Sequence, residues 1–132
     1  MLLDDAALNH LTGIVLAAAI EVHRVLGPGL LESIYVECLE HELRVRGQRF
    51  VRQLTVPITY KGTRLCASYR VDLIVEDKVV VEVKSVEGLA PVYKAQVLTY
   101  LRVTGMPAGL LVNFNVPRLT DGVKRLINPA CR

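Results

Sequence analysis

The sequence has few of the residues that build disulfide frameworks and zinc sites. Its three cysteines, Cys38, Cys66 and Cys131, lie far apart and form no C-x-x-C pair. An odd number of isolated cysteines is typical of reduced thiols in a cytoplasmic protein. The three histidines likewise lack a metal-ligand spacing such as H-E-x-x-H. We therefore expect neither residue type to carry the chemistry of this protein.

Signals for membrane insertion or export are also lacking. No apolar run reaches the ~20 residues that a membrane-spanning helix needs, and charged residues follow the apolar segment 11–20. Residues 1–5 lack the positive charges of a secretory signal. We expect a cytoplasmic protein without a membrane partner, in which segment 11–20 belongs to a buried helix.

The composition is that of a folded globular chain, with 52% hydrophobic and 22% charged residues. The length of 132 residues predicts a single domain over residues 1–132. A net charge of +3 supports nucleic-acid binding only weakly, so the distribution of charge matters more. Basic residues gather in one part of the chain, and the candidates for nucleic-acid contact are Arg44, Arg46, Arg49, Arg52 and Arg70. An ordinary solvated face is the alternative interpretation of this cluster.

Hydrophobic periodicity predicts three helices. Apolar residues recur every three or four positions over residues 5–26, and a Gly-Pro-Gly sequence ends this helix. A second helix is predicted over residues 30–46. A third is predicted over residues 91–105, where proline is well placed at the start. The third helix is expected to turn these residues inward: Val92, Ala95, Leu98 and Leu101.

Runs of β-branched and apolar residues predict strands over residues 50–60, 65–75, 79–84 and 108–114. Residues 123–127 are a candidate for a short edge strand. A helix between the third and fourth strands favours a parallel crossover. The order α-α-β-β-β-α-β predicts an α/β fold in which helices flank a mixed central sheet.

Four charged residues share one face of the hairpin predicted over residues 65–84. Because side chains alternate along a strand, Asp72 lies on the same face as Arg70, and Glu82 on the same face as Lys84. A three-residue loop, 76–78, would set Asp72 opposite Glu82 and Arg70 opposite Lys84. A two-residue loop would instead turn Asp72 toward the apolar face.

These residues predict a phosphodiesterase site. Asp72 and Glu82 supply the hard oxygen ligands that Mg²⁺ prefers. Lys84 projects to the same side, where it can lower the pKa of an attacking water or stabilise charge that grows on the phosphoryl group. The alternative is that all three are ordinary charges on a solvent-exposed sheet face.

The pattern of Asp72 followed by Glu82-Val83-Lys84, with Val71 in place of the loosely kept proline, resembles the PD-(D/E)XK nuclease superfamily. Segment 29–35, Gly-Leu-Leu-Glu-Ser-Ile-Tyr, is similar to the motif that names the GxxExxY proteins, a prokaryotic branch of that superfamily. Segments 22–29 and 109–114 also resemble that branch, so the similarity covers nearly the whole chain. The resemblance implies a restriction-endonuclease-like α-β-β-β-α-β core.

The resemblance also implies hydrolysis of nucleic acid, above all DNA, with Mg²⁺ as cofactor and Mn²⁺ as a substitute. Glu32 matches an acidic residue that joins the metal shell in related nucleases; the alternative is a carboxylate favoured by the dipole at a helix start. Tyr35, three residues on, would face the same way. Gln96 and Tyr100 match a Q-x-x-x-Y motif that helps to position the lysine and the substrate backbone. Tyr93 departs from the family pattern, in which histidine is frequent.

Two other functions remain open. One alternative is a nucleic-acid-binding module that kept the fold but does not cleave its substrate. The other is an assembly module that packs on a second copy or a partner protein. Intact Asp72, Glu82 and Lys84 argue against a binding module without turnover. A large exposed apolar patch on the first helix would favour the second.

Overall fold

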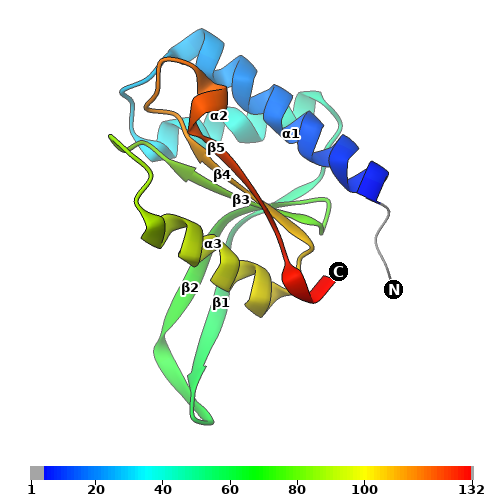
Figure 1. Cartoon of the computed structure of the whole chain (residues 1–132), viewed down its shortest axis with the longest axis vertical. Coiled ribbons are helices and arrows are strands. Elements are labelled where there is room, and N and C mark those ends of the chain that lie inside the picture. Colours follow the sequence, from blue (N-terminus) through cyan, green and yellow to red (C-terminus); the bar gives the residue numbers. More distant parts are fainter. Residues whose placement is uncertain (1–4, 132) are drawn as a thin grey trace.

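The computed structural model describes residues 5–131, so residues 1–4 and 132 of the predicted single domain lie outside the described part. Each predicted helix and strand is present, with ends that differ from the prediction by at most two residues (Figure 1). The helices are α1 (Asp5–Leu26), α2 (Glu32–Val45) and α3 (Pro91–Thr104). The strands are β1 (Phe50–Tyr60), β2 (Thr63–Val75), β3 (Val79–Lys84), β4 (Ala108–Asn113) and β5 (Val123–Ile127). Short 3₁₀ turns, η1 (Leu119–Gly122) and η2 (Pro129–Cys131), flank β5.

The strands form one mixed sheet in the order β1-β2-β3-β4-β5. β2 is antiparallel to both β1 and β3, β3 is parallel to β4, and β5 is antiparallel to β4. The parallel crossover through α3 and the edge position of β5 are therefore confirmed. β4 is buried along its whole length, as expected for a strand that is covered on both faces.

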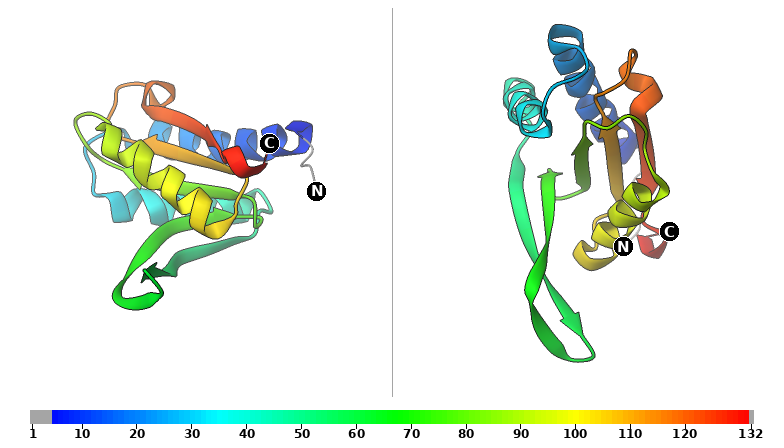
Figure 2. Two further views of the ribbon diagram at one scale, coloured as in Figure 1. Left: turned by 60° about the horizontal axis from the view of Figure 1, so that its bottom comes forward. Right: turned by 90° about the vertical axis from the view of Figure 1, so that its left-hand side faces the viewer.

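Helices cover both faces of this sheet (Figure 1 and Figure 2). α1 and α2 pack their apolar side chains on one face, against residues such as Leu73, Val81 and Leu110. α3 packs on the opposite face, where a second apolar cluster includes Val80 and Leu111. The predicted architecture, a mixed central sheet flanked by helices, is confirmed.

α1 is long and apolar enough to cross a membrane when only length and hydropathy are considered. One side of the helix lies in the core of the protein, as the core helix of a globular protein would. Its buried residues are Leu8, Leu11, Thr12, Val15, Ala18, Ala19 and Val22. Packing in the core therefore accounts for the apolar residues on this side of α1.

α3 turns a different side to the sheet than its apolar pattern predicted. Of the four residues expected to point inward, Leu101 alone is buried, and the helix buries Val97 and Tyr100 as well. α3 closely approaches β4 at Gly109, where a Cβ atom would lie 2.8 Å from the Val97 side chain. The small residue at position 109 permits this docking. The apolar periodicity of α3 does not reveal which side of the helix docks on the sheet, because apolar residues occur all around the helix.

The loop between α1 and α2 is held by Tyr35, whose side chain is fully buried. The hydroxyl donates a hydrogen bond to the carbonyl of Gly27 (2.6 Å) and accepts one from the backbone N–H of Leu30 (3.1 Å). The ring stacks on Phe114, with 4.4 Å between centroids. The prediction that Tyr35 faces the same way as Glu32 is wrong, because the aromatic ring packs in the core while Glu32 is exposed.

We expect Tyr35→Phe to lower the free energy of unfolding by about 1–2 kcal/mol, since it leaves two part-buried backbone groups without a partner. Chemical denaturation measures this change. Tyr60→Phe is the control, because Tyr60 is 60% exposed and its variant should unfold like the parent. Equal stability of the two variants would contradict the role assigned to the Tyr35 hydroxyl.

Candidate active site

Asp72 and Glu82 face each other where β2 separates from β3. The three-residue turn 76–78 sets Val75 opposite Val79, and the β2–β3 ladder ends at Leu73, the residue that follows Asp72. At Asp72 and Glu82, hydrogen bonds to the side-chain carboxylates replace the backbone pairing between the two strands. The N–H of Asp72 donates to Glu82 Oε1 (2.9 Å), and the N–H of Val83 donates to Asp72 Oδ2 (2.9 Å). The predicted three-residue loop is confirmed, and the two carboxylates lie between the strands.

β2 is also irregular at Asp72 on the side of β1. The β1–β2 ladder pairs the residues on both sides of this position, but Gln53, opposite Asp72, has a φ of 49°. A non-glycine residue in this left-handed region carries strain, and such residues are frequent at functional sites. Beyond this point Arg70 pairs with β1, and Lys84 pairs with β4. The predicted pairing of Arg70 with Lys84 is wrong, because the carboxylates end the β2–β3 ladder.

The surroundings of Asp72 and Glu82 disfavour their charged forms. Glu82 is 3% exposed, so its interpretation as a charge on a solvent-exposed sheet face is wrong. Burial, and secondly the charge of Asp72, raises the pKa of Glu82 to about 8. Burial also raises the pKa of Asp72, against the opposing effects of the Val83 N–H and the charge on Lys84. A cation beside these two groups would offset their repulsion.

Glu32 begins α2 beside the end of β3. One carboxylate oxygen accepts a hydrogen bond from the N–H of Ser85 (3.1 Å), and the Ser85 hydroxyl donates to the carbonyl of Leu30 (2.6 Å). The charge of Glu32 contributes to the raised pKa values of Asp72 and Glu82. Among residues 5–131, no three His, Cys, Asp or Glu side chains are grouped closely enough to hold a metal ion. Glu32 is therefore near the carboxylate pair but bonded to Ser85.

Residues of α3 border the site beside Lys84. The Lys84 ammonium lies over the ring of Tyr93, 4.8 Å from its centroid, and Gln96 lines an open hollow next to both. Burial, followed by the charges of the two carboxylates, raises the pKa of Tyr100 to about 12, although a hydrogen bond with Gln96 opposes the rise. The Tyr100 hydroxyl is therefore a hydrogen-bond donor at neutral pH. The residues predicted to be catalytic lie in one region of the fold: Asp72, Glu82, Lys84, Gln96 and Tyr100.

Asn113 supports this region and was not identified from the sequence. It is 1% exposed. Its side chain accepts a hydrogen bond from the N–H of Val86 (3.1 Å) and donates one to the carbonyl of Val86 (2.9 Å). Because Asn113 pairs with Lys84 in the β3–β4 ladder, this clamp holds the chain directly after Lys84. The available signal was a single amide within the apolar run 108–114.

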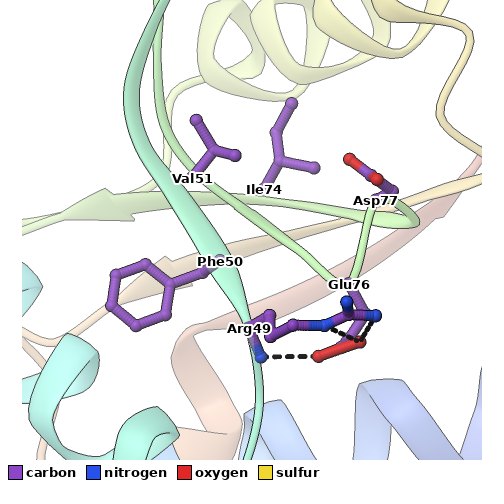
Figure 3. A pocket seen from close by; sticks show the side chains of 6 residues that line it. All are labelled: Arg49, Phe50, Val51, Ile74, Glu76 and Asp77. Carbon is purple, nitrogen blue, oxygen red and sulfur yellow. Dashed lines mark hydrogen bonds and ion pairs between the residues drawn. The ribbon is translucent and has the colours of Figure 1, made fainter.

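The arginines predicted to contact nucleic acid are distributed over several elements, and three of them form ion pairs. The pairs are Arg46–Glu42, Arg49–Glu76 and Arg52–Glu40. Figure 3 shows Arg49 beside Glu76, with bonds of 3.2 and 3.3 Å from its guanidinium. The pocket drawn there contains none of the residues predicted to be catalytic. The charge of these three arginines is therefore partly neutralised within the protein.

The other two candidate arginines are placed differently. Arg44 lies over the ring of Phe50, 5.1 Å from its centroid. The charge of Arg70 acts on Asp72, where it opposes the rise in pKa. Of the five candidates, Arg70 is therefore the one whose charge reaches the carboxylate pair.

Residues 9–126 match the family described as "PD-(D/E)XK nuclease superfamily", which is most of the chain. A comparison with curated proteins finds no match. A solved structure titled "Crystal structure of SSO0001" is 24% identical to this chain, with a TM-score of 0.56. The similarity covers 74% of this chain and 50% of that one, so the chain spans about half the length of the protein it matches. At this identity the similarity shows the fold alone.

Proposed function

Because this chain belongs to the PD-(D/E)XK nuclease superfamily, we propose that it hydrolyses phosphodiester bonds of DNA in a metal-dependent reaction. One observation carries the proposal. Asp72 and Glu82 lie between two separating strands, where the Glu82 carboxylate accepts a hydrogen bond from the Asp72 N–H and the Asp72 carboxylate accepts one from the Val83 N–H. Their surroundings raise both pKa values. Carboxyl groups whose pKa values are raised by burial and by neighbouring charges are typical of functional sites.

Asp72 and Glu82 would hold a Mg²⁺ ion, for which Mn²⁺ substitutes. Mg²⁺ usually takes one or two carboxylates and keeps several water ligands, so this pair satisfies its requirement. Glu32 would join through a water, because its carboxylate is bonded to Ser85. When bound, the ion supplies Lewis-acid chemistry and lowers the pKa of a water.

The remaining residues would act on the substrate and on each other. The Lys84 ammonium, held over the ring of Tyr93, would stabilise the negative charge that grows on the phosphoryl oxygens. Tyr100 would donate its hydroxyl hydrogen to a carboxylate or to the substrate backbone, with Gln96 keeping the hydroxyl in place. Arg70, two residues before Asp72, would bind a neighbouring phosphate.

We further propose that the chain belongs to the GxxExxY branch. Two residues of the motif have distinct structural roles, and these roles support the assignment. Glu32 bonds to the backbone directly after β3, and Tyr35 holds the loop that leads into α2. Together they position the start of α2 against the end of β3.

An assembly function is the second candidate, and exposed apolar residues favour it. Ile20, Val25 and Leu31 are 41%, 64% and 71% exposed on α1 and just before α2. These side chains would pack on a second copy of the chain or on a partner protein. An assembly or binding module without turnover would retain the carboxylate pair but would cleave no nucleic acid.

The test is incubation with labelled single-stranded, duplex and branched DNA and with RNA, in the presence of Mg²⁺ or Mn²⁺. We expect cleavage of at least one DNA, loss of cleavage with EDTA, and a loss on the order of 10³-fold in Asp72→Asn. Asp77→Asn is the matched control, because Asp77 is exposed in the β2–β3 turn and its variant should cleave like the parent. Absence of cleavage by the parent, or equal rates in Asp72→Asn, would overturn the proposal.

A further inference from the structure

β1 and β2 continue beyond the rest of the sheet as a two-stranded ribbon that projects from the body of the protein (Figure 1 and Figure 2). β3 pairs with β2 over Leu73–Val75 alone, whereas β1 and β2 stay paired out to Tyr60 and Thr63. At ~3.3 Å per residue, residues 54–60 extend roughly 20 Å beyond the end of the β2–β3 ladder, and Leu54 and Val56 at the inner end still pack against the apolar cluster of α3. Every residue from 59 to 68 is exposed. We call residues 54–71 the ribbon.

The ribbon carries uncompensated charge at one end of a long basic segment. Residues 43–71 include seven basic residues and no acidic residue. Three of the seven are paired with carboxylates of the protein body, as described above. The basic residues of the ribbon are Lys61, Arg64 and Arg70. Within the described residues, no ion pair joins any of these three to a carboxylate, so their charge is available to a partner.

The tip of the ribbon presents a cation and an aromatic ring. Tyr60 pairs with Thr63, and the two residues between them, Lys61 and Gly62, have φ values of 48° and 80°. Glycine or asparagine normally occupies the first position of such a turn, so lysine is present despite a conformational cost. Tyr60 is 60% exposed, and the Lys61 ammonium lies 5.4 Å from its ring centroid. Both groups are suited to nucleic acid, the cation to phosphate and the ring to a sugar or base.

The outer edge of the ribbon is poorly suited to pairing with another strand. Pro57 has no N–H to donate, and the β1–β2 register shifts between Pro57 and Thr59. Prolines, bulges and lysines on exposed edges prevent edge-to-edge association of sheets. Charge is therefore a better means of recognition for this ribbon than strand addition by a second copy.

We propose that the ribbon lies in the major groove of duplex DNA and guides the duplex to the carboxylate pair. This inference rests on the proposed nuclease function and names the form of its substrate. The major groove of B-DNA, ~12 Å wide, admits a two-stranded ribbon, whereas the deep, narrow major groove of duplex RNA does not. Lys61 and Arg64 contact phosphates at the outer end. Arg70, at the inner end, contacts phosphates beside Asp72.

The double variant Lys61→Ala/Arg64→Ala tests the outer contacts. Its matched control is Arg118→Ala/Lys124→Ala, which removes the same charges from exposed positions before η1 and on β5, the opposite edge of the sheet. Fluorescence anisotropy would measure the affinity for a labelled duplex DNA at several salt concentrations, with Ca²⁺ in place of Mg²⁺ to prevent cleavage. We expect the slope of log affinity against log salt to fall by about two units in the ribbon variant and to be unchanged in the control.

Equal slopes in the parent and the ribbon variant would overturn the proposal. If the ribbon variant has a reduced slope for single-stranded DNA or duplex RNA but an unchanged slope for duplex DNA, the assignment of the ribbon to the major groove is overturned. Sedimentation that shows a dimer of the parent but not of the ribbon variant, together with unchanged slopes, would identify a second copy as the occupant. Because binding is measured without turnover, the ribbon proposal can fail while cleavage is found, and it can hold while cleavage is not found.

Discussion

Glu82→Gln is expected to lower DNA cleavage on the order of 10³-fold and to stabilise the metal-free protein at alkaline pH. The amide retains an oxygen that can accept the hydrogen bond from the Asp72 N–H, so the arrangement of β2 and β3 is preserved. It removes the negative charge, which is needed for metal binding and is unfavourable in the metal-free site. Activity and stability should therefore change in opposite directions.

The direction of the stability change follows from the raised pKa of Glu82, about 8 in the folded protein. Below about pH 4 the carboxyl is protonated in both the folded and the unfolded chain, and it contributes no pH dependence. As the pH rises toward 8, the unfolded chain releases the proton while the folded chain retains it, so the folded state loses relative stability. At about 1.36 kcal/mol per pKa unit, the loss is on the order of 5 kcal/mol once the pH exceeds 8.

Thermal unfolding of the metal-free protein between pH 5 and pH 9 would measure this effect. The parent should lose stability as the pH rises, and Glu82→Gln should lose much less, with a smaller dependence left from Asp72. Glu87→Gln is the control, because Glu87 is an exposed acid in the β3–α3 segment. Calorimetric titration with Mn²⁺ should show loss of metal binding in Glu82→Gln and none in the control. The same pH dependence of stability in the parent and in Glu82→Gln would contradict the burial of an ionisable carboxyl at Glu82.

Arg52→Ala is expected to lower the free energy of unfolding by about 2–3 kcal/mol. Arg52 lies 3.3 Å from Glu40 Oε2, and Glu40 is 2% exposed. Within the described residues, this oxygen has no hydrogen-bond partner, so the arginine is its main compensation. Removing one member of a buried ion pair leaves the other charge uncompensated, which is costly. The expected loss is below that of a fully buried pair because the Arg52 side chain is 60% exposed.

Arg49→Ala is the matched control for this prediction. Arg49 also pairs with a glutamate, Glu76, but its side chain is 90% exposed. An exposed pair contributes little, so the control should lose at most about 1 kcal/mol. The double variant Arg52→Ala/Glu40→Gln should recover much of the stability, since the buried charge is then removed. Similar losses in Arg52→Ala and Arg49→Ala, or no recovery in the double variant, would contradict the compensation of Glu40 by Arg52.

The Arg52 result would also affect how nucleic-acid binding is tested. A loss of DNA affinity in Arg52→Ala would include the effect of a less stable protein. Lys61 and Arg64 avoid this difficulty, because both are exposed on the ribbon. Contacts of Arg44, Arg46, Arg49 and Arg52 with DNA stay predictions.

Local patterns in the sequence were sufficient to predict the elements and the alignment of Asp72 with Glu82. The parity of the alternation around Asp72 and Glu82 favoured a three-residue loop, and the turn 76–78 has that length. A loop of even length would have placed a carboxylate on the valine face, at a large energetic cost. The prediction that Arg70 lies opposite Lys84 extended the same ladder too far. It was wrong because side-chain hydrogen bonds replace backbone pairing at Asp72.

Long-range packing accounts for what could not be predicted. The periodicity of α3 did not show that Tyr100 and Val97 would be buried, because the docking side depends on the close approach to Gly109 on β4. The clamp between Asn113 and Val86 joins residues 27 positions apart. The buried hydroxyl of Tyr35 depends on a loop that folds back over its ring.

The sequence by itself therefore determined the helices and strands, the alignment of Asp72 with Glu82, and the resemblance that identified the superfamily. Each of these depends on residue type and on spacing along one or two neighbouring segments. The tertiary structure alone decided that Glu82 is buried, that the α3 side chains border it, and that ion pairs partly neutralise Arg46, Arg49 and Arg52 while Lys61 and Arg64 project outward. The physical reason is that desolvation and charge compensation depend on which distant residues surround a group, and a linear pattern does not contain that information.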